Sequence, residues 1–276
     1  MTDQIVTEAA PGAPDVPDAP AAPKPRDRRV LRAVARWTAA VVVCAGLGTA
    51  AAAGITALDR TDVPGLATED DGRWAYPKLT RPALPAGSPR PFTPGNTGEV
   101  HHADLRALLL PAPAGAKPDA KINGGWGTVD QFLSVYEKDA VPALKQALAD
   151  AAPRGIAARA WTMPDGTTTR IHLVRFSSVA YAEGFKDNVL KVGSDSGPAL
   201  VGASEGRIES DLSGEIRVAY TAVYPFTEKA PHGPEQTRWA YVQAGDTLAL
   251  IVQSRKGTAP LVPFQQTVAL QNQLLG

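Results

Sequence analysis

The stretch from residue 237 to residue 254, TRWAYVQAGDTLALIVQS, decides the fold class. Aromatic and β-branched residues on both sides of Gly245 are typical of strands, and a short turn centred on glycine joins antiparallel neighbours. The stretch therefore predicts a β-hairpin. A second hairpin is predicted upstream, because strand-like residues 156–162 and 168–176 flank the turn sequence MPDG at residues 163–166.

Helical signals precede, separate and follow the two hairpins. Thr128 and Gln131 form a capping-box pattern, and the apolar residues that follow recur at helical spacing up to Pro142, where the helix should kink or restart. Another helix is predicted after Ser178, and a last one at residues 263–275. Helices and hairpins thus share one region of the chain.

The order of these elements predicts an α+β fold. One further strand is predicted at residues 215–226, which together with the two hairpins gives about five strands. Strands joined by short turns pair antiparallel, and helices then gather on one face of the sheet. We therefore expect an antiparallel sheet of about five strands with helices mainly on one face, in a domain of residues 101–276.

Residues 37–58 contain no charged side chain. As a helix this segment would be about 33 Å long, enough to cross the hydrocarbon core of a bilayer. Basic residues precede it and acidic residues follow it, which by the positive-inside rule predicts a cytoplasmic N-terminus and an extracytoplasmic domain. The basic residues are Lys24, Arg26, Arg28, Arg29, Arg32 and Arg36, and the acidic residues are Asp59, Asp62, Glu69, Asp70 and Asp71. A single-pass protein of the cell membrane, held by a signal-anchor helix, is expected.

A cleaved signal peptide is the alternative interpretation of this apolar segment. The alanines at residues 51–53 offer a small-x-small cleavage site. The preceding residues 1–36 are longer than an ordinary signal-peptide n-region, which favours a retained anchor. Before their basic run these residues are rich in proline and alanine, so we expect a disordered cytoplasmic tail.

Residues 59–100 show no lasting helical or strand periodicity and are expected to form a linker. Their prolines are Pro64, Pro77, Pro82, Pro85, Pro89, Pro91 and Pro94. Polyproline II rises about 3.1 Å per residue, so the extended segment would reach roughly 130 Å. We expect this spacer to hold the domain away from the bilayer.

Composition argues against several classes of function. Lys and Arg total 28 and Asp and Glu total 28, whereas a nucleic-acid-binding domain would carry a basic excess. One cysteine, Cys44, leaves neither a disulfide framework nor a thiolate metal cluster. His101, His102 and Asp104 are three potential metal ligands, but a stable site needs a fourth group and a rigid frame. No metal and no cofactor are expected.

The sequence GASEG at residues 202–206 matches the G-x-S-x-G pattern of a nucleophile elbow, with Ser204 as the nucleophile. Asp211 and His232 follow in the chain order of α/β-hydrolases. The elbow needs a helix directly after the serine, and residues 207–214 have no amphipathic helical pattern. An extracytoplasmic serine hydrolase is therefore the alternative function, and the leading prediction assigns no catalytic residue.

Trp126 stands among glycines in the sequence GGWG at residues 124–127. Glycine neighbours leave the indole few side chains to pack against, so it can present a contact surface, as exposed tryptophans do at interfaces. A lid folded down onto the core is the other interpretation. Trp126 is the predicted binding residue.

Two segments of the chain resemble a group of uncharacterised membrane-anchored or secreted proteins of high-GC actinobacteria. The segments are the one from Asp104-Leu105-Arg106 to Pro113 and the hairpin from Arg159-Ala160-Trp161 to Gly166. The resemblance extends over the anchor, the linker and the external domain. It implies a location in the cell envelope and no particular activity.

An anchor, a spacer and an external domain without a convincing catalytic set indicate a membrane-anchored binding or sensing module of the bacterial cell envelope. Its expected partner is an envelope protein or a cell-wall component. A structural or assembly factor for an envelope complex is a further alternative. Recovery of a defined membrane complex without small-molecule binding would favour that alternative.

Overall fold

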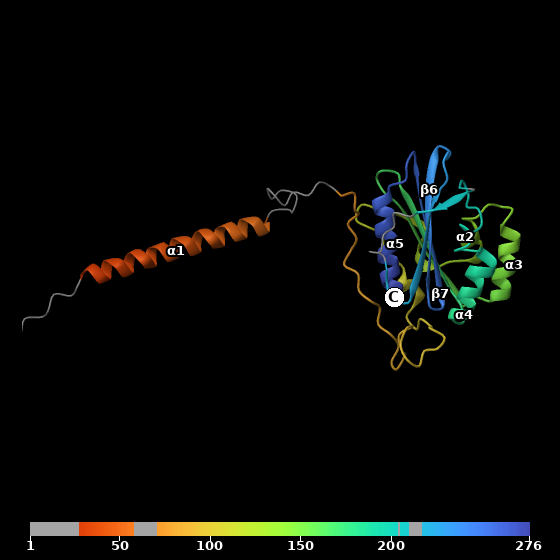
Figure 1. The fold of residues 1–276 in the computed structure, drawn as a ribbon, viewed down its shortest axis with the longest axis horizontal. Coiled ribbons are helices and arrows are strands. Elements are labelled where there is room, and N and C mark those ends of the chain that lie inside the picture. Colours follow the sequence, from red (N-terminus) through yellow and green to blue (C-terminus); the bar gives the residue numbers. More distant parts are fainter. Residues whose placement is uncertain (1–27, 58–70, 204, 210–216) are drawn as a thin grey trace, which may run out of the picture. The chain divides into compact units, whose positions relative to one another are not determined.

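The computed structural model of the chain describes residues 28–57, 71–203, 205–209 and 217–276. The chain divides into two units, Met1–Glu69 and Asp70–Gly276. Helix α1 belongs to the first unit, whereas a sheet and its covering helices form the second, called the domain below (Figure 1). The predicted cytoplasmic tail up to residue 27 lies outside the described residues.

Helix α1 (Arg28–Ala57) contains both the end of the basic run and most of the apolar segment. Its part Arg29–Gly54 contains an 18-residue window with a mean hydropathy of 1.6 and is long and apolar enough to cross a membrane. The helix starts before the predicted span of residues 37–58, because the alanine, leucine and arginine residues of the basic run also favour helix. A signal sequence would form a similar helix.

A single antiparallel sheet forms the centre of the domain, and seven strands are described in it in the order β1-β2-β3-β7-β6-β5-β4 (Figure 1). The strands are β1 (Lys117–Trp126), β2 (Gly155–Thr162), β3 (Thr168–Arg175), β4 (Gly206–Ile208), β5 (Thr221–Glu228), β6 (Glu235–Ala244) and β7 (Thr247–Lys256). Both predicted hairpins are present, as β2–β3 and β6–β7. The α+β class is confirmed, with seven strands in place of about five.

β1 and β4 account for the higher number of strands. β1 lies at one edge of the sheet with mostly exposed side chains, and its register on β2 shifts between Pro118 and Asn123 and again before Gly125. An exposed, bulged strand needs no alternation of apolar residues and so carries no periodic signal. β4 is only three residues long. The strand predicted at residues 215–226 begins at Thr221.

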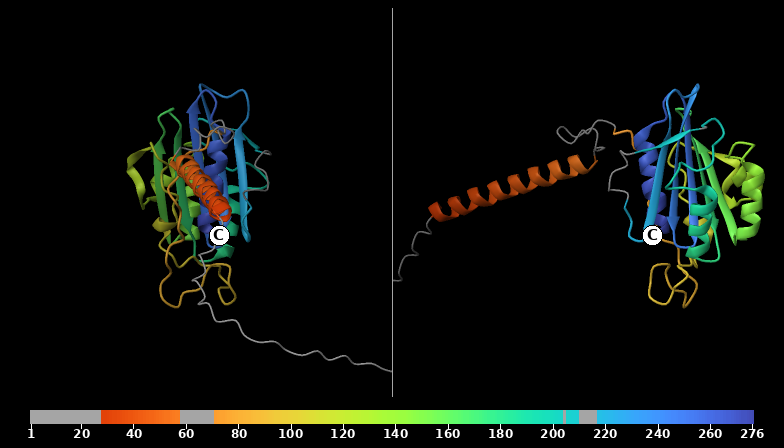
Figure 2. Two further views of the ribbon diagram at one scale, coloured as in Figure 1. Left: turned by 90° about the vertical axis from the view of Figure 1, so that its left-hand side faces the viewer. Right: turned by 45° about the vertical axis from the view of Figure 1, so that its right-hand side comes forward.

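Helices cover both faces of the sheet (Figure 2). One face carries α2 (Val129–Leu133), α3 (Val141–Ala151), α4 (Val179–Gly184) and the π-helical turn η2 (Phe185–Leu190), and the other carries the 3₁₀ turn η1 (Leu105–Leu108) and α5 (Leu261–Leu275). The prediction of helices mainly on one face therefore holds for α2, α3 and α4, whereas α5 covers the opposite face.

Local signals in the sequence explain where the helices begin. The Thr128 hydroxyl accepts a hydrogen bond from the Gln131 amide at 3.1 Å, and the Gln131 side chain accepts one from the Thr128 amide at 2.9 Å. This is the predicted capping box. Pro142 lies in the first turn of α3, where its missing N–H costs nothing, so a new helix starts there.

Alternation along the strands builds one core on each face. On β7, Leu248 and Leu250 pack under α2 to α4, whereas Ile251 packs under α5. The largest side chains of the first core are Trp239, Tyr241, Tyr136, Phe132 and Phe176, and those of the second are Trp161, Phe264, Ile171 and Leu110. A sheet buried on both faces explains why its central strands are almost wholly apolar.

Residues 71–100, which we call the strap, pack along the α5 side of the domain (Figure 1). The Trp74 amide donates to Gln266 Oε1 at 2.8 Å, and Gln266 Nε2 donates to the Trp74 carbonyl at 2.9 Å. The Tyr76 hydroxyl bonds Thr267 Oγ1 at 2.8 Å. Partly buried apolar side chains of the strap are Trp74, Tyr76, Leu79, Leu84 and Phe92. Residues from 71 onward are therefore not an extended spacer, and the predicted reach of roughly 130 Å does not hold for them.

Candidate functional site

Trp126 ends β1, and 58% of its surface is exposed. A Cβ atom on Gly155 would lie 3.0 Å from Trp126 Cζ3, so the indole lies against the backbone of β2 at a position where only glycine fits closely. The Arg106 guanidinium lies 5.0 Å from the ring centroid, in a cation–π contact. The indole is thus held by two neighbours and is still more than half open.

Arg106 is itself held in place by Asp104. Its Nη2 donates to Asp104 Oδ2 at 2.5 Å and its Nε donates to Asp104 Oδ1 at 3.0 Å, which is a bidentate pair. These hydrogen bonds lower the pKa of Asp104 to about 2. Asp104 therefore stays ionised at neutral pH and keeps Arg106 over the indole of Trp126.

A cavity of about 210 Å³ opens beside Trp126. It is lined by Val100, His101, His102, Leu105, Trp126, Arg154, Gly155 and Arg175. No acidic residue is among these described lining residues, and two guanidinium groups are. The cavity therefore offers an aromatic wall next to a surplus of positive charge.

The two arginines of the cavity differ in their surroundings. Arg175 Nη2 donates to the Ala103 carbonyl at 2.7 Å, its Nε lies 4.0 Å from Asp246 Oδ2, and burial lowers its pKa. Arg154 is exposed, and within the described part of the chain no hydrogen bond or ion pair engages its guanidinium. Arg154 is therefore the group in the cavity best able to accept an anion.

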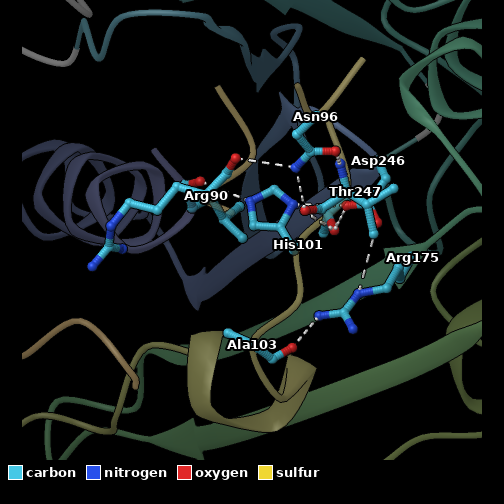
Figure 3. Close-up of polar contacts among 9 residues, drawn as sticks. Arg90, Asn96, His101, Ala103, Arg175, Asp246 and Thr247 are labelled. Carbon is cyan, nitrogen blue, oxygen red and sulfur yellow. Dashed lines mark hydrogen bonds and ion pairs between the residues drawn. The ribbon is translucent and has the colours of Figure 1, made fainter. Parts of the chain in front are cut away.

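A buried polar cluster adjoins the cavity, because His101 belongs to both. Figure 3 shows the polar contacts of the cluster. His101 Nδ1 lies 2.7 Å from Asp246 Oδ1, and His101 Nε2 donates to the Leu275 carbonyl at 2.8 Å. The Thr247 hydroxyl donates to Asp246 Oδ1 at 2.9 Å. A carbonyl only accepts, so Nε2 carries one proton, and a second proton joins Nδ1 to the carboxylate. His101 thus ties the end of the strap to the β6–β7 turn and to the end of α5.

Backbone contacts at the β6–β7 turn also hold the residues that precede His101. The Asp246 amide donates to the Glu99 carbonyl at 3.1 Å. Gly245 has a φ of +49°, and a Cβ there would lie 2.2 Å from the Glu99 carbonyl oxygen. Asn96 Nδ2 donates to the carbonyls of Arg90 and Val100 at 3.0 and 2.9 Å (Figure 3). The loop that leads into His101 is therefore fixed on both sides.

His101, His102 and Asp104 do not form a metal-ligand set in the described residues. Both ring nitrogens of His101 already have partners, and Asp104 pairs with Arg106. His102 lines the cavity with an exposed side chain.

Two of the three residues of the hydrolase alternative, Ser204 and Asp211, lie outside the described residues. His232 is partly exposed, and its Nδ1 lies 3.1 Å from the Gly233 carbonyl oxygen. The chain enters strand β4 at Gly206, where a nucleophile elbow would begin a helix. The assignment of Ser204, Asp211 and His232 stays a prediction.

His172 is a buried titratable group on the opposite face of the sheet. Neither of its ring nitrogens has a hydrogen-bond partner among the described residues, and its ring packs edge-on against Phe132, with centroids 5.8 Å apart. Burial, together with the nearby charge of Arg170, lowers its pKa to about 4. His172 is therefore neutral at pH 7.

Sequence reasoning singled out Trp126 but missed Arg154 and Arg175. Arg154 belongs to a Pro-Arg-Gly sequence that indicates the end of a helix, and Arg175 is the last residue but one of a predicted strand. Their proximity depends on the β2–β3 register, in which the Arg154 amide donates to the Arg175 carbonyl at 2.7 Å. No spacing in the sequence signals a contact of this kind.

Comparison with known proteins gives little guidance to function. No protein-family model matches the sequence, and no curated protein is significantly similar to it. The extracellular domain of PknH from Mycobacterium tuberculosis is similar in structure, with a TM-score of 0.35 and 10% sequence identity, over 61% of this chain and 93% of that chain. Similarity at this level carries no inference about function, which depends on the residues of this chain.

Proposed function

We propose that this chain is a membrane-anchored protein whose domain lies outside the cytoplasm and binds a small ring-bearing anion in the cavity beside Trp126. The observation that carries the proposal is the position of an exposed indole next to the unengaged guanidinium of Arg154. The proposed role is binding or sensing and not catalysis.

The charge pattern around α1 supports the proposed orientation. Arg29, Arg32 and Arg36 lie at its N-terminal end, and Asp59 and Asp62 follow the apolar segment. Basic residues near the end of a membrane helix stay on the cytoplasmic side. The domain, which follows the helix in the chain, would then be extracytoplasmic.

The cavity favours a ligand with one ring and one acid group. Pockets for drug-sized ligands have volumes of about 300–1,000 Å³, so a cavity of about 210 Å³ suits a single ring. Trp126 offers a flat apolar surface for a sugar or an aromatic ring. Arg154 offers a planar fork of donors that matches a carboxylate. Sugar acids and aromatic acids share these features.

Binding of glucuronate or benzoate to the purified protein tests this proposal. Glucose, which lacks the acid, and acetate, which lacks the ring, are expected to bind more weakly than the acid that carries both features. Trp126→Ala is expected to weaken binding roughly tenfold through loss of stacking, and Arg154→Gln by a similar factor through loss of a charge-assisted hydrogen bond. NMR titration measures these affinities.

Tyr181→Ala is the matched control, because Tyr181 is an exposed aromatic residue on α4, across the sheet from Trp126. This variant is expected to bind as the parent does. Preference for glucuronate or for benzoate distinguishes the two sources of the ligand. Unchanged affinity in both the Trp126 and the Arg154 variants would contradict the proposal.

A further inference from the structure

A second cleft lies on the other face of the sheet, between the strands and the segments that follow α2 and precede β4. Its volume is about 300 Å³. It is lined by Ser134, Val135, Thr168, Arg170, Leu200, Val201, Gly202, Glu235, Thr237, Val252 and Ser254. No residue that lines the Trp126 cavity lines this cleft.

Three hydroxyl groups form a row across the floor of the cleft. Thr168 of β3 pairs with Ser254 of β7, which pairs in turn with Thr237 of β6. The Thr168 hydroxyl donates to the Ser254 carbonyl at 3.4 Å, and the Thr237 and Ser254 hydroxyls lie 2.9 Å apart. One proton serves the bond between these last two hydroxyls, so the other proton is available to a ligand.

Arg170 lies two residues after Thr168 on β3, on the same face of the sheet and opposite Val252. Its side chain is exposed, and no hydrogen bond or ion pair joins its guanidinium to any residue in the described ranges. The arginine and the one available hydroxyl proton can both donate to a carboxylate, which a guanidinium recognises well. This end of the cleft therefore fits an anionic group.

Glu235 lies at the far end of the cleft, on β6. Lys256 is its cross-strand neighbour, but the two side chains form no ion pair in the described structure. Arg170 and Glu235 lie two strands apart in the sheet and are offset by four residues along the strands. Their Cα atoms are therefore about 16 Å apart. Both side chains line the cleft. An extended peptide spans about 3.5 Å per residue, so three residues cover most of the separation between the two Cα atoms and the two side chains can cover the rest.

We propose that this cleft binds a short peptide with free ends, its carboxylate on Arg170 and the hydroxyl row and its ammonium group on Glu235. The apolar walls formed by Val135, Val201 and Val252 suit small apolar side chains in between. The proposal is independent of the Trp126 cavity, which lies on the opposite face of the sheet.

Ligand-observed NMR titration of the full chain in detergent micelles tests this proposal with trialanine as the probe. Trialanine amide lacks the carboxylate, and N-acetyl-trialanine lacks the ammonium group. Trialanine is expected to bind, with each blocked peptide binding at least tenfold more weakly. Arg170→Gln is expected to weaken trialanine binding tenfold or more, and Glu235→Gln severalfold.

Arg255→Gln is the control, because Arg255 follows Ser254 but points to the other face and pairs with Asp165 at 3.1 Å. Its affinity for trialanine is expected to equal that of the parent. Equal affinity in the Arg170 variant, or equal binding of the three peptides, would overturn the proposal. Absence of trialanine binding would overturn it as well.

Discussion

Replacing Asp246 with alanine is expected to lower the free energy of unfolding of the domain by about 3–5 kcal/mol. Asp246 is fully buried and accepts from Thr247, and it shares a proton with His101. Without the carboxylate, the buried Nδ1 of His101 keeps only the Thr247 hydroxyl as a neighbour, at 3.4 Å. Arg175 also loses the carboxylate that lies 4.0 Å away.

Urea unfolding at pH 7 measures this loss. Asp130→Ala is the matched control, because Asp130 pairs with Lys145 at 2.9 Å on the surface and such pairs contribute about 1 kcal/mol or less. If Asp246→Ala costs no more than Asp130→Ala, the cluster does not hold the strap to the β6–β7 turn. The Trp126 cavity depends on this cluster, since His101 and Arg175 line it.

Acid destabilisation through His172 is the second large expected effect. The pKa of a histidine is 6.5 in an unfolded chain and about 4 for His172 in the fold. As the pH falls below 6.5, the unfolded chain binds the proton first, so the folded state loses stability until the pH approaches 4. The stability is complete above pH 6.5, and about 3 kcal/mol of it is lost near pH 4.

His172→Leu is expected to remove this contribution. The difference in unfolding free energy between pH 7 and pH 4.5 should be about 2–3 kcal/mol smaller in the variant than in the parent. Val262→Ala is the control, because Val262 is an exposed residue without a titratable group and its variant should keep the parent's pH dependence. An identical pH dependence in the His172 variant and the parent would contradict the assigned burial of this ring.

The sequence predicts those parts of the fold whose signals are local. The hairpin around Gly245 and the capping box at Thr128 each depend on a few neighbouring residues, and both are present. The strap carries no such signal. Trp74 and Phe92 are separated by prolines and anchor the chain without any period, so composition alone indicates a linker.

The candidate sites likewise combine residues that the sequence signals with residues that only the fold brings together. Trp126 is conspicuous in sequence because its neighbours are glycines. The cavity beside it also needs Arg154 and Arg175, which strand register brings together. Likewise, the hydroxyl row of the second cleft joins three strands whose order in the sheet differs from their order in the chain. Long-range pairing of strands has no counterpart in local spacing.

An extracytoplasmic domain is the premise on which the proposed function depends. Cys44 is the chain's single cysteine, so a Cys44→Ser background permits site-specific labelling. Thr2→Cys reports on the N-terminal tail, and Thr162→Cys places a thiol at an exposed position of β2. Intact cells producing each variant are treated with a membrane-impermeant maleimide. We predict labelling of Thr162→Cys in intact cells and of Thr2→Cys only after permeabilisation, and the reverse pattern would contradict the proposed function.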